Sequence, residues 1–287
     1  MKKWLTILGL SILFWSCQDV VEVDVPESEP ELVIDGWVTD SLPTEVRLST
    51  TAPFFSEGQT PRVSGALVRL FENDSLVATL NESNQEQGLY LSSYRGRVGS
   101  SYHVEVEVPS TYAEPINGGW RSRAARMKRI TSIDSINIRN LNRNTQPPAF
   151  SEGEYALLYF QEIPGEGDII NVSRFLNDSI FQRDIFILED TGLDGFYIGD
   201  VIPPVGAYGP FRESDEGDTL RIRFESITED YASFLGVLSE QVFVGSPFDA
   251  PPALVVGNIH REGDTLDYAF GYFRASALSG TQIIYQP

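Results

Sequence analysis

The pattern of apolar and polar residues predicts a chain built mainly from short β-strands. In the run 32–39 both alternating sets of positions are largely apolar, which indicates a strand buried substantially on both faces. A period of two recurs further along and predicts strands at 45–49, 63–71, 76–80, 88–94 and 102–108, with Gly65 at a bulge or turn and a hairpin through 72–74. Short strands separated by turns in this way are typical of a β-sandwich.

The second half of the chain predicts another β-rich unit that contains one helix. Strand-like runs occur at 130–138, 155–163, 179–188, 219–224, 254–259 and 268–275, whereas 190–200 and 201–211 are rich in Gly, Asp or Pro and are expected to be loops. The helix is expected at 229–243, because Thr228 is a good N-cap and Glu229 and Asp230 suit a first turn. Apolar residues then follow at helical spacing.

The N-terminus has the organisation of an export signal. Lys2 and Lys3 precede an apolar run at 4–15, and Ser16 places a small residue before Cys17, the only cysteine of the chain. The apolar run has about 12 residues, whereas a transmembrane helix needs about 20, so the segment is expected to be cleaved. A lone cysteine cannot form an intrachain disulfide, and its position calls for another role.

These patterns divide the chain into consecutive parts. Residues 1–16 are expected to be the signal peptide, and 17–30 an acidic, proline-containing tether. Residues 31–108 would form the first β-sandwich, 109–125 a linker rich in Pro and Gly, and 126–287 the second β-rich domain. The expected fold class is therefore mainly β, with a sandwich followed by a β-rich domain that carries one helix.

Composition restricts the chemistry of the chain. With 21 basic and 41 acidic residues the formal net charge is −20, which argues against nucleic acid as a partner, because phosphate binding depends on Lys and Arg. The same charge disfavours docking to anionic lipid headgroups. One cysteine and two histidines offer no metal cluster, and catalytic fingerprints such as G-x-S-x-G, H-E-x-x-H and the Walker loop are absent from the sequence. Neither an enzyme nor a cofactor is predicted.

The N-terminal segment resembles a bacterial lipoprotein signal, in which Cys17 becomes the acylated first residue of the mature protein. Phe14 and Trp15 depart from the usual residues before the cysteine, as is familiar in lipoproteins of the Bacteroidota. Several acyl chains would hold the protein firmly in a membrane. The acidic stretch 18–24 resembles the signal that sends such lipoproteins to the outer cell surface. The alternatives are an ordinary signal peptide with an accidental cysteine, and a tether without a sorting role.

Two resemblances concern the folded part. The runs V-S-G-A-L-V-R-L at 63–70, G-L-Y at 88–90 and S-Y-H-V-E-V-E-V at 101–108 look like an immunoglobulin-like domain of the transthyretin-like type. Together with Cys17, the motifs E-L-V-I-D-G-W-V-T at 31–39, V-S-G-A-L-V at 63–68, I-D-S-I at 133–136 and G-Y-F-R-A-S at 271–276 resemble a family of Bacteroidota outer-membrane lipoproteins, domain of unknown function 4249, often encoded beside TonB-dependent receptors.

This family resemblance implies a location and a partner rather than a reaction. It implies a non-enzymatic lipoprotein, held in the outer membrane by N-terminal acyl chains and facing the cell exterior. Its partner would be a TonB-dependent outer-membrane receptor, which it would serve as an accessory or ligand-binding component. A stand-alone glycan- or matrix-binding adhesin is the alternative, and a hydrolase is less favoured.

One tripeptide form recurs along the chain: Asp, then Ser or Thr, then an aliphatic residue. It resembles the acceptor at which Bacteroidota attach O-linked glycans to exported proteins. A turn that leads into a strand requires the same residues, so both interpretations hold for each site. The candidate hydroxyls are those of Ser41, Ser75, Ser135, Ser179, Thr219 and Thr265.

Two acidic groups have ligand types that suit cations. Asp190, Asp194 and Asp200 are weak candidates for calcium, because the spacing lacks the middle acidic position and the final Glu of an EF-hand, and an acidic turn without metal is favoured. His260, Glu262 and Asp264 alternate and would share one face of an extended segment, as zinc or acid–base chemistry requires. An exposed hairpin end is favoured for them. His103 lies on the polar side of its strand.

Exposed aromatic residues are the candidates for ligand binding. Tyr197, Tyr208 and Phe211 lie in or beside expected loops, and Trp37 and Trp120 could add to a sugar-stacking or peptide-binding surface. A basic cluster at 121–129 could bind a partner, but pairing with the chain's own acidic residues is favoured.

Overall fold

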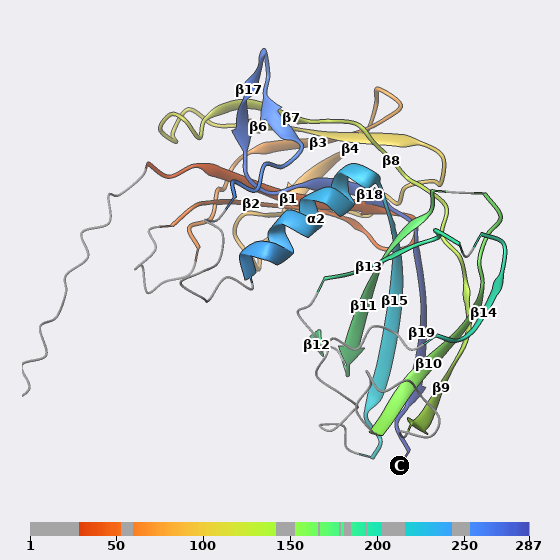
Figure 1. The fold of residues 1–287 in the computed structure, drawn as a ribbon. Coiled ribbons are helices and arrows are strands. Elements are labelled where there is room, and N and C mark those ends of the chain that lie inside the picture. The colour runs from red at the N-terminus through yellow and green to blue at the C-terminus, as the bar shows by residue number, and fades with distance from the viewer. Residues whose placement is uncertain are drawn as a thin grey trace, which may run out of the picture.

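The computed structural model describes residues 29–52, 60–141, 153–165, 167–177, 179–180, 185–192, 194–201, 216–242 and 253–286. Strands dominate these residues, as the sequence predicts, and they form two units that each contain an apolar core (Figure 1).

The first unit is an 11-stranded sheet. Its hydrogen-bonded order is β17-β16-β7-β6-β3-β4-β5-β2-β1-β18, and β8 pairs with β6. The strands are β1 (Leu32–Thr39), β2 (Thr44–Thr50), β3 (Leu67–Glu72), β4 (Ser75–Glu82), β5 (Leu89–Ser92), β6 (Ser101–Val108), β7 (Gly118–Ser122), β8 (Ala125–Arg126), β16 (Ile259–Arg261), β17 (Asp264–Ala269) and β18 (Phe273–Ser276).

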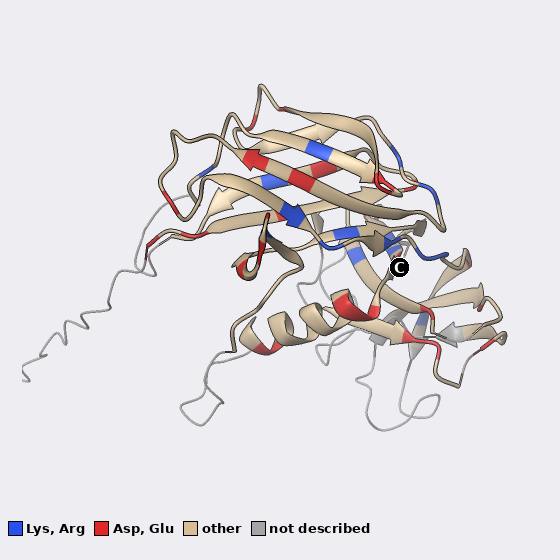
Figure 2. Ribbon diagram, turned by 90° about the horizontal axis from the view of Figure 1, so that it is seen from above, with Lys and Arg blue, Asp and Glu red and all other residues tan. Residues whose placement is uncertain are grey.

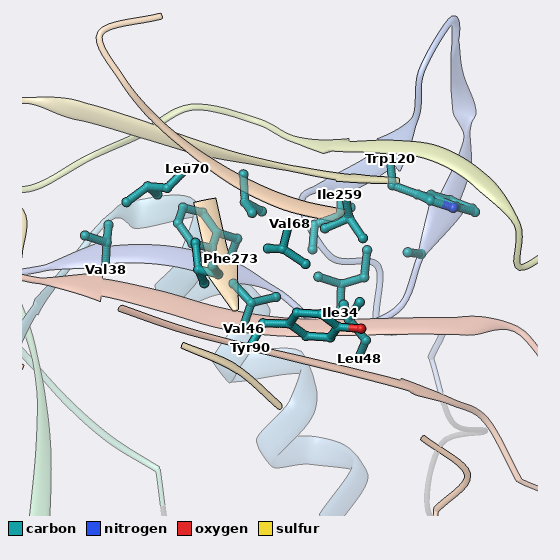
Figure 3. Packing of buried hydrophobic residues seen from close by; sticks show 14 of the residues in the cluster. Ile34, Val38, Val46, Leu48, Val68, Leu70, Tyr90, Trp120, Ile259 and Phe273 are labelled. Atoms are coloured by element: carbon teal, nitrogen blue, oxygen red, sulfur yellow. The ribbon is translucent and has the colours of Figure 1, made fainter. Parts of the chain in front are cut away.

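The large sheet folds over at β4, so that its two halves face each other. β4 pairs with β3 on one side and with β5 on the other. The period of two in each strand directs one set of side chains inward, and these sets meet in a single core that includes Ile34 and Val46 from one layer and Val68 and Leu70 from the other (Figure 3). The inward residues named here are 0% exposed, so the predicted alternation is confirmed.

The hairpin predicted through 72–74 joins β3 to β4. Asn73 and Asp74 both have positive φ, at 47° and 62°, as the tight turn of a two-residue hairpin requires. Gly271, between β17 and β18, also has a positive φ, at 86°. A side chain there would approach the carbonyl oxygen of Ile34 to 2.2 Å, so the backbone contact between this turn and β1 depends on glycine.

The range 109–125 contains structure where the sequence analysis expects a linker. β7 lies inside it and pairs with β6 and with β16. Trp120 of β7 is 2% exposed and belongs to the first core. The prolines and glycines that suggested a linker surround this strand rather than replace it. The boundary at 125–126 also differs from the observed sheet, because β16, β17 and β18 return from the far end of the chain to the first unit.

The second unit consists of two smaller sheets. A 3-stranded sheet has the order β14-β10-β9, and a 5-stranded sheet has the order β12-β11-β15-β19 with β13 paired to β11. Their strands are β9 (Ile133–Leu141), β10 (Gly153–Gln161), β11 (Ile169–Leu176), β12 (Ser179–Ile180), β13 (Phe186–Glu189), β14 (Tyr197–Val201), β15 (Thr219–Ile227) and β19 (Leu278–Ile284). Apolar residues of both sheets, including Leu158 of β10 and Phe224 of β15, share one core.

Several strands of this unit differ from the sequence expectation. β11 and β19 were not expected, and β14 begins inside the range expected to be a loop. Residues 254–257, part of the range 254–259 expected as a strand, have no regular secondary structure, and β16 begins at Ile259. Within the range 179–188, expected as one strand, the described residues include β12 and the first part of β13.

The predicted helix is confirmed as α2 (Glu229–Val242). Thr228 caps it, because its Oγ1 accepts a hydrogen bond from the N–H of Tyr231 at 3.3 Å. Tyr231 and Leu235 face a small cluster with Ile227 and Tyr272, which places the helix against both units (Figure 1). No helix within the described ranges is long and apolar enough to cross a membrane.

Candidate binding site

The two units meet at the side chain of Arg274 on β18. Its Nε donates a hydrogen bond at 2.8 Å to Oε1 of Glu225, which lies on β15 of the second unit. Its guanidinium carbon lies 5.1 Å from the ring centroid of Trp37 on β1 and 5.4 Å from that of Tyr231 on α2. Asp35 of β1 adds a carboxylate at 3.7 Å. One cation therefore contacts the first unit, the second unit and the helix.

Glu225 is a buried charge that is held by its partners. Its side chain is 5% exposed, and that of Arg274 is 17% exposed. Nδ2 of Asn171 lies 3.4 Å from the second carboxylate oxygen of Glu225. Burial is the largest single influence and by itself would raise the pKa of Glu225. The charges of Arg274 and Arg223, together with the hydrogen bond from Arg274, lower that pKa below the ordinary value. The carboxylate therefore stays ionised at neutral pH, and we define the Arg274–Glu225 pair as the junction pair.

Trp37 belongs to a row of outward side chains that crosses five strands of the large sheet, in the order β18, β1, β2, β5 and β4. The register pairs Trp37 with Arg274 of β18 on one side and with Glu45 of β2 on the other. Glu45 pairs with Leu91 of β5, and Leu91 pairs with Asn81 of β4. Because neighbouring strands lie about 4.8 Å apart, the row is about 19 Å long. We call this row the Trp37 face.

An open pocket of about 570 Å³ lies along the Trp37 face. Trp37 and Leu91 supply apolar surface, and Leu91 is 37% exposed. Glu45 and Asn81 supply a carboxylate and an amide. The other lining residues are Leu42, Pro43, Ser92 and Ser93. Pockets of this size that combine aromatic surface with a few polar groups are the usual form of ligand sites.

The other aromatic candidates have different surroundings. Trp120 is 2% exposed and is covered by Arg261, whose guanidinium carbon lies 4.4 Å from its ring centroid, so it is a core residue. Tyr197 on β14 is 57% exposed, in the second unit. Tyr208 and Phe211 lie outside the described residues. Among the described candidates, Trp37 is the one that lines a pocket on the large sheet.

The acidic group at 190–200 is used to hold turns together. Oδ2 of Asp190 accepts hydrogen bonds from the N–H groups of Gly167 at 2.8 Å and of the next residue at 3.2 Å. Oδ1 of Asp194 accepts one from the N–H of Gly165 at 2.6 Å. The side chain of Asp200 is outside the described residues. Asp190 and Asp194 thus bind backbone donors, as expected for the alternative of an acidic turn.

His260, Glu262 and Asp264 lie at the hairpin between β16 and β17. His260 pairs in register with Tyr268, and Oδ1 of Asp264 accepts a hydrogen bond from the N–H of Leu266 at 2.9 Å. No group of His, Cys, Asp and Glu in the described part of the chain has the arrangement of a metal site. The favoured hairpin interpretation describes these three residues well.

His103 is buried although it lies on the outward side of β6. Its ring stacks on Phe71 with the centroids 4.7 Å apart. Nδ1 lies 3.8 Å from Asp74, and Nε2 lies 3.9 Å from Glu105. Burial lowers the pKa of His103, and the nearby charge of Arg121 acts in the same direction. His103 is thus a packed side chain within a charged surface.

The basic cluster is divided between several surroundings. Arg121 lies 3.6 Å from Glu105, which also binds Arg69 at 3.1 Å, and basic and acidic positions lie side by side on this layer (Figure 2). Arg129 binds Asp168 at 3.1 Å. These residues of the cluster pair within the chain, whereas Arg123 and Arg126 are exposed.

The candidate glycan acceptors lie at strand starts or edges. Asn73 and Asp74 form the turn before Ser75, and Thr219 and Thr265 each stand at the start of a strand after a Gly-Asp turn. Thr219 is half-buried. The exposed residues of the set are Ser41, Ser75, Ser135, Ser179 and Thr265. The turn interpretation describes Ser75, Thr219 and Thr265, whereas Ser135 is the third residue of β9. Modification of these hydroxyls stays a prediction.

The described structure is thus a mainly β protein with one described helix, in which two cores are joined through a buried ion pair and an open pocket lies beside the junction. The chain belongs to the family described as Domain of unknown function (DUF4249), which matches residues 18–281. No curated protein matches the sequence.

Proposed function

We propose that this chain is a non-enzymatic lipoprotein of the outer cell surface, anchored in the outer membrane through acyl chains on Cys17. It acts there as an accessory or ligand-binding component of a TonB-dependent receptor complex. The observation that carries the proposal is the place of Cys17. The family match begins at residue 18, directly after the cysteine, so the apolar run before it lies outside the matched region.

The anchor hypothesis has a physical basis in the residues around Cys17. An apolar run of about 12 residues suits a cleaved signal better than a membrane span, which needs about 20. Two or more acyl chains on one residue give stable membrane attachment. The acidic tether at 17–30 would then separate the folded units from the membrane and leave their surfaces accessible to a partner.

A binding role is supported by the kind of site that the fold presents. The pocket on the Trp37 face is open and combines aromatic, amide and hydroxyl groups. Of the histidines considered for catalysis, His103 is packed against Phe71, and His260 belongs to a hairpin. These positions favour recognition of a ligand over chemical conversion.

The anchor is tested by replacing Cys17 with Ala in the native organism. The variant should lose incorporation of a fatty-acid label and appear in the soluble fraction after a high-salt wash. Ser16→Ala is the matched control, because it keeps a small residue before Cys17 and should remain labelled and membrane-bound. A Cys17→Ala protein that stays in the membrane fraction would contradict the proposal.

The partner is tested separately. Native protein purified from detergent-solubilised membranes should carry a TonB-dependent receptor with it, and antibodies against the folded units should label intact cells. Replacing Asp19, Glu22 and Asp24 by their amides should abolish labelling of intact cells but keep the anchor. Repeated purification without a receptor would overturn the accessory role, and labelling only after permeabilisation would overturn the surface location.

A further inference from the structure

The Trp37 face combines chemical groups that together define a ligand class. The indole of Trp37 offers a flat apolar surface, and its neighbours along the row are hydrogen-bonding groups and one aliphatic side chain. The indole is also held in place, because the guanidinium of Arg274 lies 5.1 Å from its ring centroid. A rigid aromatic side chain loses little conformational freedom on binding.

The polar groups of the pocket suit hydroxyl groups. Glu45 is a hydrogen-bond acceptor, Asn81 both donates and accepts, and Ser92 and Ser93 can do either. Hydroxyl groups of a ligand also donate and accept, so each has a complementary partner here. Glu45 already binds Arg47 at 3.4 Å through one carboxylate oxygen. A purely apolar ligand would still cover the exposed amide of Asn81 without giving it a hydrogen-bond partner.

Charge narrows the class further. The pocket is lined by one carboxylate and by neither Lys nor Arg. Glu45 is paired with Arg47, but the formal net charge of the chain is −20, so an anionic ligand would be repelled at long range. Phosphorylated or uronic-acid ligands are therefore disfavoured, whereas neutral polyhydroxylated ligands carry no such penalty.

The shape of the pocket distinguishes between a monosaccharide and an oligosaccharide as the ligand. The pocket is open, and the Trp37 face continues across β1, β2, β5 and β4. Three strand spacings of about 4.8 Å give the part of the row from Trp37 to Asn81 a length of about 14 Å, which is greater than the width of one sugar ring. An open row of this length fits a segment of a linear oligosaccharide better than an enclosed monosaccharide.

We infer that the Trp37 face is a binding site for neutral oligosaccharides, in which Trp37 stacks on a sugar ring and Glu45 and Asn81 bind its hydroxyl groups. The inference rests on the proposed function only in assigning a ligand-binding role. It names the ligand class and the side chains, and it does not depend on Cys17 or on a receptor.

The test uses full-length protein in detergent and an array of neutral oligosaccharides of increasing length, beside uronic-acid-containing ones and unstructured peptides. Neutral oligosaccharides should bind, and longer ones more tightly than disaccharides. Trp37→Ala should weaken the binding measured by calorimetry by about tenfold or more, since loss of one stacking contact costs on the order of 1.4 kcal/mol. Tyr197→Ala is the matched control, because it removes an exposed aromatic ring of the second unit and should leave affinity unchanged.

A second variant separates binding from folding. Asn81 is exposed, so Asn81→Ala should keep the melting temperature of the native protein and still weaken binding. The inference is overturned if neutral oligosaccharides do not bind, if acidic glycans or peptides bind in preference, or if Trp37→Ala and Asn81→Ala bind normally. Loss of binding in Tyr197→Ala alone would place the site in the second unit instead. A negative result in this binding test would not affect the proposed anchor or receptor partner. Negative results in the anchor and receptor experiments would likewise not affect the proposed oligosaccharide site.

Discussion

Replacing Glu225 with Gln should destabilise the protein strongly, because it removes the nearest counter-charge of a buried cation and leaves the carboxylate of Asp35, at 3.7 Å, to compensate it only in part. The substitution keeps the shape of the side chain and removes its charge. Arg274, at 17% exposure, would retain its guanidinium next to a neutral amide. The junction pair also joins β18 of the large sheet to β15 of the 5-stranded sheet, so the change acts where the two units meet.

The size of the effect follows from the burial of the junction pair. Removing one partner of a buried ion pair costs about 3–5 kcal/mol, since the remaining charge stays desolvated. An exposed pair contributes about 0–1 kcal/mol. Arg47 and Glu86 form such a pair in the same protein, with Glu86 at 44% side-chain exposure. Glu86→Gln is therefore the matched control, and it should cost no more than about 1 kcal/mol.

A double variant separates charge from packing. Arg274→Met keeps an unbranched side chain against Trp37 and Tyr231 but removes the cation that hydrogen-bonds to Glu225, so alone it should also destabilise the protein. Combined with Glu225→Gln it removes both charges of the junction pair, and the double variant should lose less stability than the sum of the two single losses. A coupling free energy of about 2 kcal/mol or more is expected for side chains in direct contact.

The assay is urea denaturation at pH 7, followed by tryptophan fluorescence and by circular dichroism. Trp37 and Trp120 report on the first unit, and circular dichroism reports on all strands. In Glu225→Gln the midpoint should fall well below that of Glu86→Gln. Equal midpoints for the two variants, or strictly additive losses in the double variant, would refute the assignment of a stabilising buried pair at the junction.

The junction pair also predicts a pH dependence. The pKa of Glu225 is lowered in the folded state, so its contribution is present above the pKa of an unfolded glutamate, about 4.3. It is lost as the pH falls through the lower folded-state pKa. The native protein should therefore lose stability more steeply than Glu225→Gln as the pH falls below about 5. Equal slopes of unfolding free energy against pH for the native protein and Glu225→Gln would contradict the lowered pKa of Glu225.

Further predictions concern other sites. Gly271→Ala should lower the free energy of unfolding by more than about 2 kcal/mol, because it combines a positive φ with a backbone clash. Gly263→Ala, with φ of 85° and open space around it, should lower it by about 1 kcal/mol. Thermal denaturation compares the two variants, and equal losses of stability would contradict the clash at Gly271. His103→Gln should make the free energy of unfolding depend less on pH between about pH 7 and 5. The pKa of His103 is lowered in the folded protein, so the native protein loses stability as the pH falls below about 6.5, the pKa of an unfolded histidine. An unchanged pH dependence in the variant would contradict this prediction. Asp194→Ala should cost about 1 kcal/mol through its lost backbone hydrogen bond, and a rise in melting temperature of the native protein on adding calcium would contradict the structural role.

Local signals of the sequence correctly indicate much of the fold. The apolar run at 32–39 identifies β1, although only one of its two faces is fully buried, and alternation identifies β6. The hairpin through Asn73 and Asp74 is correct, and the cap and spacing identify α2. β11 was missed for a physical reason. Its inward set contains Arg174, which is 4% exposed, so a charged residue interrupts the expected apolar period. β7 was hidden by the prolines and glycines around it.

Pairings between distant segments are not encoded in local periodicity. The pairing of β18 with β1 joins residues near the two ends of the chain. The pairing of β16 with β7 joins the last part of the chain to residues near its middle. The candidate binding site also depends on pairings between distant segments. Trp37 is among the aromatic residues that the sequence offers for ligand binding. The partners Glu45, Asn81 and Leu91 become neighbours only through the register of separate strands.

Arg274 belongs both to the junction pair and to the Trp37 face. Its guanidinium binds Glu225 of the second unit and lies over the indole that borders the pocket. The position of the Trp37 indole in the proposed ligand site therefore depends on the contact between the two units. Arg274→Met keeps the indole and the pocket residues but removes the cation that holds the ring. Its affinity for neutral oligosaccharides should therefore fall by less than that of Trp37→Ala, and a larger loss would mean that the guanidinium itself contacts the ligand.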